Sequence, residues 1–201
     1  MRAGQIDLLD LELPITLRPS ARVSDEELMR FSEHNKPFKI ERIKDGDLTI
    51  ESGLGGIDGI RHGQVAAALY RWIEEDATGM GFSPSVGFNL SDGSCLQPDA
   101  SWITLERWNA LTLKQQTGFP PLCPDFVVEV RSQTDSRRTL EDKMQTWLDN
   151  GAKLAWLVDP IAASVTIYRP GHAPETLVRP ETVRGEAPVD GFELRCTRLW
   201  A

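Results

Sequence analysis

The sequence has few cysteines and no long apolar segment, and each shortage excludes a class of protein. Its three cysteines, Cys95, Cys123 and Cys196, are odd in number, widely separated and never in a CxxC arrangement. This spacing excludes a disulfide framework and a zinc knuckle, so we expect buried free thiols. The longest apolar runs, such as Val65–Leu69, are far shorter than the ~20 residues of a membrane-spanning helix.

Excess basic charge and a secretory signal are missing as well. Residues 1–7 lack the apolar core and the small-residue cleavage site of a signal peptide, so we expect a cytoplasmic protein. The formal net charge is −8, whereas proteins that hold a phosphate backbone usually present clustered Lys and Arg. Contact with nucleic acid must therefore be local. The densest basic cluster consists of Arg131, Arg137, Arg138 and Lys143.

The composition is otherwise that of a soluble globular protein, with 40% hydrophobic and 26% charged residues among 201. This length predicts one domain with one sizeable core. Residues 1–22 mix leucines with Pro14 and Pro19 and predict an N-terminal arm that packs on the core or on a neighbouring subunit. Residues 23–201 form the predicted single domain.

Hydrophobic periodicity and turn signals predict a mixed α/β (α+β) architecture, in which helices flank a mixed β-sheet. The capping-box spacing of Ser24 and Glu27 indicates that a helix begins there. Apolar residues from Val65 to Ile73 at helical spacing indicate another helix, with His62 one turn earlier on the same face. The remaining predicted elements are hairpins over 38–50, 82–104 and 154–168, helices over 106–116 and 139–150, and a strand over 124–131.

The strand over 124–131 carries charges on one face of an otherwise apolar segment. Side chains alternate along a strand, so Asp125, Glu129 and Arg131 share a face. A buried carboxylate needs a partner, hydrogen bonds or a metal ion. One interpretation is a structural ion pair between Glu129 and a nearby base, and Asp125 at the strand start is suited to capping backbone amides.

A second acid, Asp99 of the Pro98-Asp99 pair, enters from another predicted strand. Asp125 and Glu129 are four strand residues, or roughly 13 Å, apart, so these two cannot share one cation. Asp99 and Glu129 can do so if their strands are neighbours. Two carboxylates with water are the usual protein ligands of Mg²⁺, with Mn²⁺ as an alternative, and such an ion activates water for attack on a phosphodiester.

Carboxylates alone repel a phosphate, so the chemistry requires a nearby cation. Arg131 can clamp a phosphate but is a poor proton acceptor. Lys143, at the border of the buried stripe of its predicted helix, is the better candidate for handling the nucleophile, although border lysines often only extend to solvent. We assign Arg137 and Arg138 to substrate binding, together with His62 unless that histidine is simply packed.

Two short motifs, Pro98-Asp99 and Glu129-Val130-Arg131, resemble the motifs of the PD-(D/E)xK nuclease superfamily. The longer context resembles the Uma-type family of restriction endonucleases within it, from about Asp25 to Gly171. The motifs concerned are Gln97–Trp102, Pro124–Ser132, Lys143, Asn150–Ala152 and Trp156–Pro160.

The resemblance implies a restriction-endonuclease-like core and magnesium-dependent cleavage of DNA, commonly by homodimers. It assigns Asp99 and Glu129 as metal ligands. The superfamily lysine falls on Arg131 here, so catalysis requires Lys143 to project its amine into the same space.

Two other functions stay open. The chain is a non-catalytic binding or interaction module if Glu129 forms a closed ion pair with Arg131 or Lys143, an interpretation that the acidic net charge favours. A hydrolase with His62 or a cysteine as nucleophile has weaker support, because the sequence has neither a GxSxG elbow nor a paired Cys-His motif.

Overall fold

The computed structural model describes residues 13–201, and these form two compact units built from interleaved segments. Unit 1 takes the described residues up to Gly53 together with Ser85–Gln97 and Leu111–Leu122. Unit 2 takes Leu54–Pro84, Pro98–Ala110 and Cys123–Ala201. The predicted arm over residues 1–22 lies partly outside the described residues, and its boundary stays a prediction.

Unit 1 is a five-stranded sheet with one long helix. The strands are β1 (Ile15–Leu17), β2 (Lys39–Arg42), β3 (Leu48–Glu51), β5 (Phe88–Asn89) and β6 (Cys95–Leu96), in the order β1-β3-β2-β6-β5. Helix α1 (Asp25–His34) begins with the predicted capping box between Ser24 and Glu27. The short helix α4 (Leu113–Thr117) completes the unit, whose core centres on Leu28, Ile40, Ile50 and Cys95.

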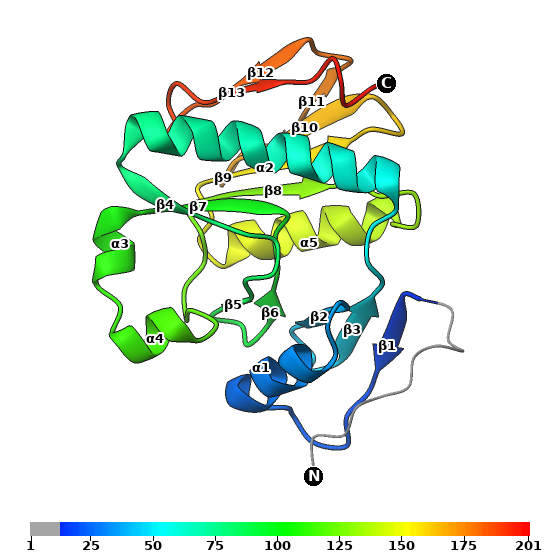
Figure 1. The fold of residues 1–201 in the computed structure, drawn as a ribbon, viewed down its shortest axis with the longest axis vertical. Helices are drawn as coiled ribbons and strands as arrows, with labels where there is room; N and C mark the ends of the chain where they lie inside the picture. The colour runs from blue at the N-terminus through cyan, green and yellow to red at the C-terminus, as the bar shows by residue number, and fades with distance from the viewer. Residues whose placement is uncertain (1–12) are drawn as a thin grey trace. The chain divides into compact units, whose positions relative to one another are not determined.

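Unit 2 is built on a six-stranded mixed sheet in the order β11-β10-β9-β8-β7-β4 (Figure 1). Only β8 and β9 run parallel, and their crossover contains helix α5. The bounds are β4 (Gly79–Phe82), β7 (Ala100–Thr104), β8 (Phe126–Val130), β9 (Leu154–Asp159), β10 (Ser164–Tyr168) and β11 (Glu175–Val178). This topology confirms the predicted mixed sheet flanked by helices.

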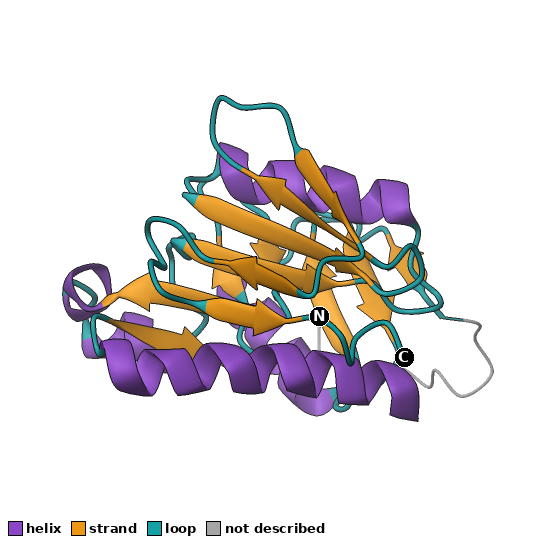
Figure 2. Ribbon diagram, turned by 90° about the horizontal axis from the view of Figure 1, so that it is seen from above, coloured by secondary structure: helices purple, strands orange, loops and turns teal. Residues whose placement is uncertain are grey.

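Helices α2 (Gly56–Asp76) and α5 (Arg137–Asp149) cover opposite faces of this sheet (Figures 1 and 2). Val65 and Leu69 of α2 join the main core with Trp102, Phe126 and Trp156 from the strands. On the other face, Met144 and Trp147 of α5 are fully buried. Helix α5 ends as predicted before Gly151, whose φ of +108° favours glycine.

The C-terminal segment adds a small antiparallel pair, β12 (Thr182–Arg184) and β13 (Glu193–Arg195), on the α2 side of the unit. Phe192, Leu194 and Leu199 are buried in the main core. All three cysteines are free and buried, as predicted, and burial raises the pKa of Cys196 to about 11. A thiol that holds its proton at neutral pH removes support from the cysteine-nucleophile interpretation.

Two predicted elements were wrong in their continuity. The second strand of the hairpin expected over 82–104 is interrupted at Gln97–Asp99, so β6 pairs with β5 in unit 1 whereas β7 pairs with β4 in unit 2. Pro98 accounts for the break, because proline has no N–H to donate to a neighbouring strand. The helix expected over 106–116 is instead α3 (Leu105–Asn109) and α4, separated where Thr112 caps the second helix.

Helix α2 is the longest of the described helices at 21 residues. Across residues 13–201, no helix combines the length and the hydropathy required to cross a membrane.

Candidate active site

Asp99 lies immediately before β7, at the end of the sheet where β8 finishes. Its N–H donates to the Val128 carbonyl at 3.1 Å, and its Oδ2 accepts from the Val130 N–H at 2.7 Å. The antiparallel register Ala100↔Val128, extended by one residue, sets Asp99 opposite Glu129. The two predicted metal ligands therefore come from neighbouring strands, as the sequence analysis required.

Glu129 is the fourth residue of β8 and is 1% exposed. Lys143 reaches it from α5, with Nζ at 3.0 Å from Oε1 and 3.1 Å from Oε2. The indole N–H of Trp147 donates to Oε1 at 2.9 Å. Lys143 and Trp147 are four residues apart and so project from the same side of α5. Two donors thus hold both carboxylate oxygens in a fixed orientation.

His62 approaches Asp99 from α2, the helix on the other face of the sheet. Its Nδ1 lies 3.4 Å from Asp99 Oδ1, and the two side chains are 8% and 10% exposed. One turn earlier, Asp58 accepts from the Gln133 N–H at 3.3 Å and lies 3.5 Å from Arg61. These contacts tie the first turns of α2 to the loop that follows β8.

Arg131 and Arg137 do not join the two acids but meet at Asp159, the last residue of β9. Arg131 Nη1 lies 3.1 Å and Arg137 Nη1 lies 3.7 Å from Asp159 Oδ2. Arg137 also pairs with Glu141, which raises the pKa of Arg137. Arg138 is exposed at the second position of α5. Arg131, which the resemblance aligns with the superfamily lysine, is thus paired with Asp159.

Asp125 has a structural environment, in agreement with the capping interpretation. It is fully buried, accepts from the Thr104 N–H at 3.1 Å, and pairs with Arg107 at 2.8 Å and Lys153 at 2.9 Å. Burial alone would raise the pKa of Asp125, but the Lys153 ammonium, the Thr104 N–H and the Arg107 guanidinium together hold that pKa below its usual range. Its oxygens are committed to three partners.

Asp99 and Glu129 fit a hard divalent cation by their chemistry, because each supplies carboxylate oxygens at the same end of the sheet. Throughout residues 13–201, no three His, Cys, Asp or Glu side chains are grouped as a metal site. An ion held by these two acids would take its other ligands from water, backbone or phosphate oxygens, which is common for Mg²⁺.

Two contributors to this arrangement, Trp147 and Asp159, were not predicted as site residues from the sequence. Trp147 belongs to the buried stripe of its helix, and its position four residues after Lys143 is the signal by which the sequence indicates that both side chains lie on one side of the helix. Asp159 enters the sequence analysis only as part of the motif Trp156–Pro160, without a role. Its contact with Arg131 depends on the parallel pairing of β8 with β9, where Val130 lies opposite Val158, and that register is not readable from either segment alone.

Comparisons with known proteins identify the family and the fold. Residues 25–197 match the model of the Uma2 family, described as "Putative restriction endonuclease". The fold is similar to the crystal structure of "a putative nuclease belonging to DUF820" from Anabaena variabilis, with a TM-score of 0.69 and 19% identity over 80% of this chain and 89% of that chain. At this identity the likeness establishes a shared fold. No curated protein matches the sequence.

Proposed function

The chain belongs to the Uma2 family of putative restriction endonucleases, and from this premise we propose that it is a metal-dependent endonuclease that hydrolyses phosphodiester bonds in DNA. The observation that carries the proposal is the partly buried Lys143 ammonium held against Glu129, next to the strand that presents Asp99. An acid pair that can hold a divalent ion, with an amine beside it, is a charge arrangement that supports phosphodiester hydrolysis.

The residues would divide the chemistry as follows. Asp99 and Glu129 would hold Mg²⁺ or Mn²⁺, which supplies Lewis-acid activation of water when bound. Lys143 would orient the attacking water and neutralise charge on the phosphate. Arg131 stays anchored to Asp159 and contributes positive charge at a fixed position. His62, beside Asp99, would contact the substrate or hold that carboxylate in orientation.

A non-catalytic binding module is the second candidate, and one observation favours it. Both Glu129 oxygens already have donors, with the carboxylate 1% and the Lys143 side chain 12% exposed. A closed pair of this kind is sufficient as a structural element, since breaking a buried ion pair costs about 3–5 kcal/mol.

Plasmid nicking tests the proposal directly. Supercoiled DNA is incubated with Mg²⁺ or Mn²⁺ and with wild type, Asp99→Asn, Glu129→Gln or Lys143→Met. We expect nicking by wild type only, with losses of at least ~100-fold in each variant. Lys143→Arg is the matched control that keeps the charge but not the amine. Equal nicking by wild type and the acid variants would show a contaminating nuclease.

Stability measurements on the same variants separate the two candidates. Glu129→Gln combined with Lys143→Met removes both charges, so the double variant should recover much of the unfolding free energy that each single variant loses. If the chain is a nuclease, the double variant regains this stability but still does not nick DNA. A wild type that neither nicks DNA nor binds Mg²⁺ in titration calorimetry, with the same stability pattern, would establish the structural module.

A further inference from the structure

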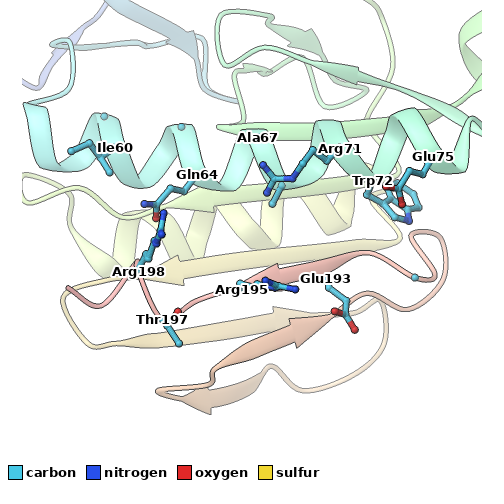
Figure 3. A pocket seen from close by; sticks show the side chains of 14 residues that line it. Ile60, Gln64, Ala67, Arg71, Trp72, Glu75, Glu193, Arg195, Thr197 and Arg198 are labelled. Atoms are coloured by element: carbon cyan, nitrogen blue, oxygen red, sulfur yellow. The ribbon is translucent and has the colours of Figure 1, made fainter.

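A groove of about 940 Å³ runs between helix α2 and strand β13 in unit 2 (Figure 3). Its helix side includes Gln64, Ala67 and Arg71, and its strand side includes Glu193, Arg195 and Arg198. Trp72 and Glu75 lie at one end and Arg198 at the other (Figure 3). The groove shares α2 with the candidate active site, because His62 leaves the same helix toward Asp99.

Alternation along β13 explains why the groove is polar on that side. Phe192, Leu194 and Cys196 are buried in the main core, so Glu193, Arg195 and Thr197 point outward. On α2, Val65 and Leu69 face the core, which leaves Ala67 and Arg71 on the exposed side. The groove is therefore the outer face of two elements that pack together through their apolar sides.

Charge is distributed unevenly in the groove. Arg71, Arg195 and Arg198 are exposed, and none of the three forms a hydrogen bond or an ion pair with any other residue in 13–201. Glu193 is engaged outside the groove by Arg184, whose Nε lies 2.9 Å from its Oε1. Glu75 is then the remaining acid against three arginines. This local excess of positive charge stands out in a chain whose net charge is −8.

Small residues allow a ligand backbone to approach α2 closely. A Cβ atom built on Gly59 or Gly63, both at the groove, would meet nothing within 4 Å. Ala67, farther along the same helix, also has a small side chain at the groove. A bulky anionic chain can therefore lie against the helix while the guanidinium groups reach its charges.

We propose that the groove between α2 and β13 binds the sugar-phosphate backbone of nucleic acid, with Arg71, Arg195 and Arg198 contacting phosphates. The proposal rests on the proposed function, since it identifies a surface by which the nuclease holds DNA. Arginine pairs with phosphate through parallel N–H donors, and three such contacts supply affinity without reading sequence. The net negative charge of the rest of the chain repels a polyanion, which favours binding at the groove over binding elsewhere.

Salt-dependent DNA binding tests this assignment. Anisotropy of a fluorescein-labelled duplex is measured in EDTA, where metal-dependent cleavage cannot occur, for wild type and for the triple variant Arg71→Ala, Arg195→Ala and Arg198→Ala. Each phosphate contact contributes about 0.9 to the slope of log affinity against log salt, so the triple variant should lose about 2–3 of that slope. We expect at least tenfold weaker binding at ~0.1 M salt.

Matched variants control for net charge and folding. Arg18→Ala, Lys36→Ala and Lys44→Ala together remove the same charge from exposed positions of unit 1, and we expect affinity within about twofold of wild type. Gly63→Glu adds a carboxylate in open space on α2 and should weaken binding without loss of thermal stability. Inorganic phosphate, matched in ionic strength to chloride, should displace the duplex no better than chloride does.

Three outcomes would overturn the proposal. The first is a salt slope in the triple variant equal to that of wild type. The second is displacement of the duplex by inorganic phosphate more effectively than by chloride. The third is a molar mass of the triple variant, measured by light scattering, that differs from that of wild type while DNA binding is unaltered. The last would assign the groove to contact between copies of the chain. Because binding is measured without metal, an Asp99→Asn protein that binds but does not nick DNA leaves the groove assignment intact, as does a wild type that binds without nicking.

Discussion

Asp125 and Glu129 lie on the same face of one strand, yet their surroundings give them different tasks. Asp125 accepts one backbone N–H and pairs with two bases from neighbouring elements, so its oxygens have no capacity for chemistry. Glu129 is held by a lysine and an indole from a single helix. Its only ionic partner among these contacts is the Lys143 amine, so a metal ion or a substrate phosphate at Glu129 would meet one cation rather than two.

Asp125→Asn should make stability less sensitive to acid. The folded pKa of Asp125 lies below its unfolded value, so its contribution is fully present above about pH 3.9 and is lost as pH falls through the folded pKa. We expect the variant to lose about 3 kcal/mol at pH 7, because Arg107 and Lys153 lose their partner. Urea unfolding at pH 7, 5 and 3 measures this, and a deficit that does not shrink toward pH 3 would contradict it.

Single residues could be predicted where their local pattern carried the information. The acid on an apolar strand pointed to Glu129, and the border position on an amphipathic helix pointed to Lys143, whose nitrogen lies beside that carboxylate. The roles of both stay predictions. The partnership of Arg131 with Asp159 had no local signal, because it arises from the pairing of two strands separated by a helix.

At the scale of elements, glycines inside helices and strands differ in what surrounds them. Gly63 lies in the middle of α2, and a Cβ there would meet nothing within 4 Å. Gly79 begins β4, and a Cβ there would collide with the Trp102 ring and the Ile103 carbonyl. Identical substitutions at these two positions should therefore have opposite effects.

Gly63→Ala should raise the unfolding free energy by up to about 1 kcal/mol, because alanine favours the helix over glycine. Gly79→Ala should lower it by about 3 kcal/mol, since Trp102 must leave its position in the core. Denaturant titration of the two variants beside wild type provides the measurement. Destabilisation by Gly63→Ala would mean that the groove side of α2 is more crowded than described.

Elements with their own start and stop signals were predicted well. The capping box at Ser24 and the glycine after α5 placed two helices within two residues of their observed ends. The failures occurred where one polar or cyclic residue divided a periodic pattern. Thr112 starts a new helix and Pro98 ends a strand, and both were read as interior positions.

For the whole molecule, the homodimer is the prediction most open to direct test. Enzymes that cut both strands of a duplex gain from two copies of a site related by a two-fold axis. Light scattering after gel filtration should give twice the chain mass of 22.4 kDa over a range of concentrations. Asp99→Asn serves as the control with an unchanged exterior. A single-chain mass throughout would reject the dimer.

The fold class of the whole molecule could be predicted from the sequence, but its division into two compact units could not. The order of helices and strands was sufficient to predict a mixed sheet flanked by helices. The division into two units was not predictable, because each unit is assembled from three separate stretches of chain and no composition shift marks the crossings. Phe88, for example, is buried in unit 1 although both neighbouring stretches, 54–84 and 98–110, belong to unit 2.

This interleaving has a consequence for how the protein is made. During synthesis the segments of unit 1 are complete once Leu122 leaves the ribosome, whereas unit 2 must wait for β13, more than seventy residues later. Helix α2 is therefore translated long before the strand that covers its apolar flank. Until β13 is made, that apolar flank of α2 lacks the cover that β13 provides, and transiently exposed apolar surface of this kind favours aggregation.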